Sequence, residues 1–67
     1  MVSGREVVRA LAKVGFSEVS QRGSHLKLRS PEGRTVIVPM HRELARGTLR
    51  SILRQADLTV EAFIELL

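Results

Sequence analysis

The sequence contains no cysteine, tyrosine or tryptophan, and phenylalanine occurs only twice among its 67 residues. Without cysteine, the chain has neither disulfide bonds nor thiolate ligands for a structural metal. With so few aromatic rings, a sheet surface that binds single-stranded nucleic acid by base stacking is disfavoured. A core built mainly from aliphatic side chains must therefore stabilise the fold.

The chain also lacks a long apolar run and a cluster of acidic residues. No aliphatic stretch exceeds three residues, as in Val36-Ile37-Val38, whereas a membrane span needs roughly 20. Met1 leads directly into a charged amphipathic stretch, so we expect no secretory signal, no membrane contact and a cytoplasmic location. The seven acidic residues are scattered singly, which leaves no paired cluster for a two-metal nuclease. We accordingly expect neither a metal nor another cofactor.

Length and charge define the scale of the protein and its partners. A chain of 67 residues allows one domain, which we expect to span residues 1–67. Basic residues exceed acidic ones by 11 to 7, for a net charge of +4 and a pI of about 11.2. This excess indicates nucleic acid or an acidic protein as partner. Nine of the basic residues are arginine, which binds phosphates in a forked geometry, although genome composition or heat adaptation explains arginine richness equally well.

Helix signals occur near both ends of the chain. Ser3 and Glu6 have the spacing of a capping box, and Gly15 is a suitable stop, which predicts a helix over residues 4–14. Gly47-Thr48 precedes a second amphipathic pattern. In that second helix we expect a buried stripe of Leu49, Ile52 and Leu53 and a cationic stripe of Arg46, Arg50 and Arg54.

A short final helix follows, for which Thr59 is a suitable cap. Between the helices, the pattern predicts strands at residues 16–22, 24–30 and 35–38. Gly23 and a turn at residues 31–34 connect the strands, and Pro39 ends the third. Phe16 and Val19 fall on opposite phases, so we expect Phe16 to pack back on the first helix.

The resulting order is α-β-β-β-α with a short C-terminal helical extension. We therefore predict an α+β fold, in which a three-stranded antiparallel sheet packs against helices on one face.

The residues around His25 carry the strongest functional signal. Side chains two apart share a face of a strand, so His25, Lys27 and Arg29 lie together, opposite Leu26 and Leu28. An imidazole is the side chain whose ordinary pKa lets it both take and give a proton near neutrality. Beside two cations, its natural substrate is a phosphate.

RNA cleavage fits this arrangement because RNA carries its own nucleophile, the 2′-hydroxyl. His25 is the candidate general base or general acid, and Lys27, roughly 7 Å away by strand geometry, neutralises charge on the phosphate. Gly23 and Ser24 have small side chains, so the backbone can approach the substrate closely. The cationic strip is extended by Arg22 and Arg29. No metal is required.

Simpler interpretations of these residues remain open. His25 is also readable as a solvated polar residue on a sheet surface. His41, in a polar loop, is either an auxiliary acid or base or an ordinary loop residue. The arginine stripe of the second helix is typical of a solvated face, which still raises non-specific affinity for nucleic acid.

Three stretches taken together resemble a known family. They are Gly15-Phe16 with Arg22-Gly23-Ser24-His25, then Val38-Pro39-Met40-His41, then residues 47–56 with Leu58-Thr59 and Phe63. In this order and spacing they closely resemble the HicA (YcfA-like) toxin family of bacterial type II toxin–antitoxin systems. The resemblance extends from Gly4 to Leu67.

This resemblance implies a fold like that of the double-stranded-RNA-binding domain. It also implies an mRNA interferase that cleaves transcripts without a metal. The essential histidine of the family matches His25, and a further conserved histidine matches His41. The usual partner is a HicB antitoxin, encoded next to the toxin, which masks the histidine face.

Two alternatives belong to other functional classes. One is a non-catalytic RNA-binding module of the same fold, which reads the shape and phosphates of an A-form helix. The other is a helix-turn-helix DNA regulator built on residues 49–67. Its recognition helix would carry Glu61 and Glu65, which repel phosphates. We therefore expect no specific DNA binding by this chain alone, and a monomer until the partner binds.

Overall fold

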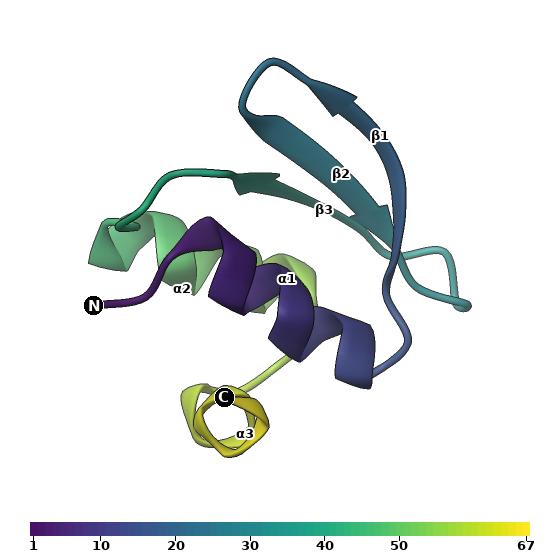
Figure 1. The fold of residues 1–67 in the computed structure, drawn as a ribbon. Helices are drawn as coiled ribbons and strands as arrows, with labels where there is room; N and C mark the ends of the chain where they lie inside the picture. Colours follow the sequence, from purple (N-terminus) through teal and green to yellow (C-terminus); the bar gives the residue numbers. More distant parts are fainter.

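The structure, a computed structural model, describes residues 1–67. Its elements are α1 (Gly4–Lys13), β1 (Ser17–Arg22), β2 (His25–Arg29), β3 (Thr35–Pro39), α2 (Arg46–Gln55) and α3 (Val60–Leu66). The strands form one antiparallel sheet in the order β1-β2-β3, and the helices lie on one side of it (Figure 1). The predicted α+β fold is confirmed. No helix combines the length and apolar character needed to cross a membrane.

The two terminal helices begin where their caps predict. Ser3 Oγ accepts a hydrogen bond from the Glu6 amide at 3.1 Å, and the Glu6 carboxylate accepts one from the Ser3 amide at 2.9 Å. Thr59 Oγ1 accepts from the Ala62 amide at 3.1 Å and starts α3. Both caps satisfy helix amides that have no partner within the helix.

The start of α2 differs from the expectation. Gly47 and Thr48 lie inside its first turn, because the Leu49 amide already donates to the Ala45 carbonyl at 2.9 Å. Ala45 is the N-cap and has no side-chain acceptor to offer. The arginine stripe is exposed as predicted, since Arg46, Arg50 and Arg54 all face solvent.

The first strand has a β-bulge that the alternation alone does not reveal. Glu18 pairs with Leu28 and Ser20 with Lys27, so Val19 has no partner on β2. The extra residue shifts the phase of the strand. Phe16 is buried just before β1, and its amide donates to the Leu11 carbonyl at 3.1 Å. Phe16 therefore turns back to α1, as expected.

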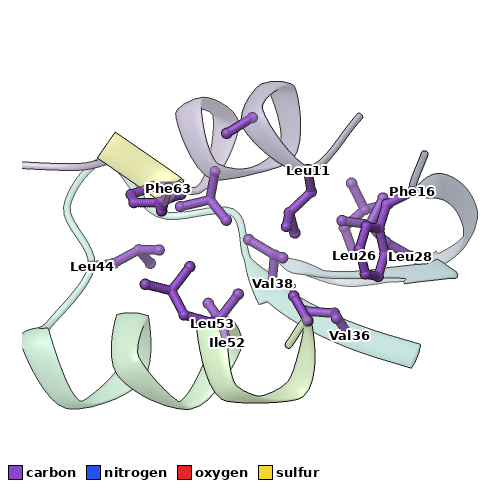
Figure 2. Close-up of a cluster of buried hydrophobic side chains, with 13 residues drawn as sticks. Leu11, Phe16, Leu26, Leu28, Val36, Val38, Leu44, Ile52, Leu53 and Phe63 are labelled. Carbon is purple, nitrogen blue, oxygen red and sulfur yellow. The ribbon is translucent and has the colours of Figure 1, made fainter. Parts of the chain in front are cut away.

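The core lies between the inner face of the sheet and the helices, where Figure 2 shows the side chains meeting. β2 and β3 each supply two buried side chains, while every residue of β1 is exposed. Each fully buried aliphatic side chain contributes about 1.5–3 kcal/mol. The 13 core residues are Val7, Ala10, Leu11, Phe16, Leu26, Leu28, Val36, Val38, Leu44, Ile52, Leu53, Ala56 and Phe63.

The start of α1 is packed directly against the end of β3. The Gly4 amide donates to the His41 carbonyl at 2.9 Å. A Cβ atom placed on Gly4 would overlap the Pro39 carbonyl oxygen and crowd the Met40 Cα. Only glycine fits this approach of two backbones, which fixes the loop after β3 relative to the sheet.

Candidate functional site

The outer face of the sheet, opposite the helices, carries the residues predicted around His25. Leu26 is buried beneath the sheet, whereas His25 is exposed and Lys27 is half-buried. The two face-sharing residues of β2 therefore lie on the open side, as their alternation predicts. Because the core uses only the inner face, the outer face is free to contact a ligand.

The neighbouring strands complete the rows on this face. His25 has Arg22 of β1 and Pro39 of β3 as its paired neighbours. Lys27 has Ser20 and Ile37 in the same positions, one row further along the sheet. Directly paired residues have Cβ atoms about 4.5–5.5 Å apart, so each row brings three side chains together.

A shallow hollow of about 620 Å³ occupies the first two of these rows. It is lined by Ser20, Arg22, His25, Lys27 and Ile37, which we call the histidine hollow. Three of the predicted site residues thus meet in one place. Its walls hold two cations and no acidic side chain, so the hollow attracts anions.

Arg29, predicted as part of the cationic strip, stands one row beyond this hollow. Its Nε lies 3.5 Å from Thr35 Oγ1 on β3. Arg29 is not among the residues that line the histidine hollow. The structure therefore places it beside the hollow and not within it.

Gly23 and Ser24 form the tight connection that leads into β2. Gly23 has φ +58°, a left-handed conformation that favours glycine, and a Cβ added there would meet nothing within 4 Å. Its carbonyl accepts a hydrogen bond from Gln21 Nε2 at 3.0 Å. The Ser24 carbonyl accepts from the Met40 amide at 2.6 Å. The turn is exposed and borders the hollow without lining it.

The imidazole of His25 is unengaged within the protein. Neither ring nitrogen makes a hydrogen bond or an ion pair to another residue. The Lys27 ammonium is also unpaired, since the one ion pair in the structure joins Arg34 and Asp57 at 3.4 Å. Both groups are available to a substrate phosphate.

His41 lies apart from His25. It lines a second hollow of about 350 Å³, together with Ser3, Arg5, Met40 and Arg42, which we call the α1 hollow. The structure therefore does not bring the two histidines into one site.

Sequence reasoning missed two residues of the histidine hollow. Ile37 is the exposed member of the run Val36-Ile37-Val38, and only the pairing register sets it beside Lys27. Ser20 reaches the same row because the bulge at Val19 shifts the phase of β1. Alternation in β3 could have indicated Ile37, but no local signal identifies the bulge.

The acidic and histidine side chains form no metal centre. Nowhere do three or more His, Cys, Asp or Glu residues gather closely enough to hold a metal ion. The chemistry that these residues can perform is proton transfer by an imidazole and charge stabilisation by two cations, Lys27 and Arg22.

Comparison with known proteins adds a family to this geometry. No curated protein gave a significant match. The family model for the HicA toxin of bacterial toxin–antitoxin systems matches residues 4–58, which include α1, the whole sheet and α2. Because this match covers most of the chain, the protein belongs to the HicA toxin family of bacterial toxin–antitoxin systems.

Proposed function

We propose that this toxin is an endoribonuclease that cleaves mRNA without a metal ion, with His25 as its proton-transfer group. The observation that carries the proposal is the exposed, unengaged imidazole in a hollow whose other charged residues are cations. Membership of the HicA family supports it independently. Such a toxin acts where mRNA is translated, in the cytoplasm.

The nucleophile is the 2′-hydroxyl of the substrate. Its oxygen attacks the adjacent phosphorus, and the bond from phosphorus to the 5′-oxygen breaks. One proton leaves the 2′-hydroxyl and another is delivered to the 5′-oxygen, which gives a 2′,3′-cyclic phosphate and a 5′-hydroxyl. His25 serves one of these two transfers as general base or general acid.

Lys27 and Arg22 stabilise the charge that builds on the phosphate oxygens. Their positions on either side of His25 follow from the strand pairing, so they are held before substrate arrives. Cations that are positioned in advance lower the barrier without reorganising during the reaction. The small side chains of Gly23 and Ser24 leave room for the RNA backbone beside the hollow.

One histidine supplies only one of the two proton transfers. The other falls to water, to Lys27 or to a group of the substrate. General acid–base catalysis by one side chain contributes typically about 10²–10⁴-fold, so we expect a modest turnover rate and a loss of that size in His25→Ala.

The test is cleavage of an end-labelled mRNA in EDTA by wild type and by His25→Ala, each checked for folding by circular dichroism. Arg54→Ala, on the exposed stripe of α2, is the matched control and should cleave like wild type. Cleavage that disappears only in His25→Ala supports the mechanism. Equal cleavage by wild type and His25→Ala would contradict it and indicate another catalytic residue or a contaminant.

A toxin of this family has an antitoxin partner. We propose a HicB-type protein that inhibits by covering the histidine hollow with an acidic surface, because charge complementarity speeds such association. Modification by diethyl pyrocarbonate, read by mass spectrometry, tests this: His25 should be protected in the complex. His25 that is modified equally in free and bound toxin would exclude occlusion.

One observation favours a second candidate, a non-catalytic RNA-binding module. Catalytic bases are usually oriented by a further hydrogen bond, and no protein group holds the His25 ring. If wild type and His25→Ala both bind RNA and neither cleaves it, this candidate replaces the nuclease.

A further inference from the structure

The α1 hollow contains a group of cations that the proposed chemistry does not use. Arg5, His41 and Arg42 line it together with Ser3 and Met40. We propose that this group binds a backbone phosphate of the RNA, next to the phosphate held at His25. The inference rests on the proposed function, because it assigns a second contact to the same substrate.

Two backbone hydrogen bonds connect the two hollows. Met40, which precedes His41, donates its amide to the carbonyl of Ser24, which precedes His25, at 2.6 Å. Gly4 donates its amide to the His41 carbonyl at 2.9 Å. The residues that lead into each histidine are therefore joined directly. The hollows lie side by side at the end of the sheet where β3 meets α1.

The cations of the α1 hollow have no acidic partner. Neither Arg5 nor Arg42 makes an ion pair or a side-chain hydrogen bond, and both are exposed. The nearby Glu6 carboxylate is held by the Ser3 amide at 2.9 Å. Glu43 follows Arg42 in sequence but does not line the hollow. The positive charge of the hollow is therefore not cancelled within the chain.

The end of α1 is not itself the anion ligand. Its cap is already occupied, since Ser3 Oγ accepts from the Glu6 amide and Gly4 donates to the His41 carbonyl. The side chains of Arg5, Arg42 and His41 remain as donors. Two guanidinium groups and an imidazole match a phosphate, which offers several oxygen acceptors to forked donors.

An RNA backbone is the ligand because of where the hollow lies. Contacts to phosphates fix the register of a nucleic acid on a protein, whereas the reacting groups act at one position only. A nuclease with one histidine depends on holding its substrate in place, and a second phosphate contact beside His25 does so. His41 then acts as a hydrogen-bond donor to the backbone and not as the missing proton-transfer group.

The test measures binding of a fully 2′-O-methylated RNA oligonucleotide as a function of salt concentration. This probe lacks the 2′-hydroxyl nucleophile, so the result does not depend on whether the protein cleaves RNA. The test variant is Arg5→Ala/Arg42→Ala. The matched control is Arg50→Ala/Arg54→Ala, which removes the same charge from the exposed stripe of α2.

We expect the slope of log affinity against log salt to become shallower by about 1.4 in the test variant, because each lost contact to a single strand removes about 0.7. The control should keep the wild-type slope. An unchanged slope in the test variant would overturn the inference and leave the hollow as a surface for an acidic protein. An equal change in both variants would also overturn it, because net charge alone would then explain the effect.

A kinetic measurement on the natural substrate gives a second readout. His41→Gln should raise KM several-fold with kcat unchanged, because the contact is made equally in the bound substrate and in the transition state. A fall in kcat with KM unchanged would instead place His41 in the chemistry and contradict its assigned role. Loss of cleavage in every variant, with the salt slopes as expected, would count against the nuclease and not against the phosphate contact.

Discussion

Lys13 at the end of α1 donates a hydrogen bond from its Nζ atom to the carbonyl oxygen of Leu66, in the last turn of α3, at 2.8 Å. The two residues are 53 positions apart in sequence. The carbonyls of a last helical turn have no partner within the helix, and a cation suits the negative end of its dipole. This contact therefore attaches α3 to the rest of the domain.

The first prediction concerns this attachment. Lys13→Met should lower the free energy of unfolding by about 0.3–1 kcal/mol at low salt, the usual range for a cation at an exposed helix end. The loss should shrink at high salt, because the interaction is solvent-exposed. Urea denaturation at two salt concentrations measures it. Arg22→Met, which removes a cation without such a contact, should change little.

The second prediction compares two glycines. Gly4→Ala should destabilise the fold by about 1–3 kcal/mol or more, because the new methyl group meets the backbone of β3. Gly47→Ala should stabilise it by about 0.5–1 kcal/mol, because that glycine lies in α2 with open space around its Cα. Thermal unfolding of both variants measures the difference. A stable Gly4→Ala protein would show that α1 can move away from β3.

The third prediction concerns Glu6 and pH. A hydrogen bond from the Ser3 backbone amide, and then one involving the Ser3 side chain, lower the pKa of Glu6 from its ordinary value. Because the folded state favours the carboxylate, its contribution to stability is present at neutral pH. That contribution is lost as pH falls below the ordinary glutamate pKa of about 4.3 and through the lower folded value.

Ser3→Ala separates the two causes, because it removes the hydroxyl and keeps the backbone amide. The pKa of Glu6, followed by NMR titration, should rise only part of the way to its ordinary value. The same variant should lose about 0.5–2 kcal/mol of stability at neutral pH through its lost cap. A complete return of the pKa to its ordinary value would show that the backbone amide contributes nothing.

The fourth prediction tests Lys27 in the proposed reaction. Lys27→Met should lower kcat by about 10²-fold, the usual loss when one group that stabilises transition-state charge is removed. Lys27→Arg should recover part of that loss. Arg29→Met should have a smaller effect, because Arg29 lies outside the histidine hollow. Similar rates for Lys27→Met and wild type would remove Lys27 from the mechanism.

The parts of the fold that depend on neighbouring residues could be predicted from the sequence. The capping pair Ser3 and Glu6 and the cap at Thr59 act within one helical turn, so their spacing identifies them. The start of α2 and the bulge at Val19 could not be predicted. Both depend on how distant segments pack and pair, which a local pattern does not contain.

The same division applies to the candidate site. Alternation along one strand is enough to place His25 and Lys27 on a common face. The position of Ile37 beside Lys27 requires the register between two strands. The separation of His41 from the histidine hollow depends on the contact between α1 and the end of β3, and the sequence has no signal for that contact.

The complete exposure of β1 has a consequence for the divergence of these toxins. No side chain of this strand belongs to the core, yet Ser20 and Arg22 form one wall of the histidine hollow. Substitutions there alter the surface that meets the substrate while leaving the folded state intact. Natural selection can therefore vary what this wall recognises, generation after generation, without first having to repair the stability of the domain.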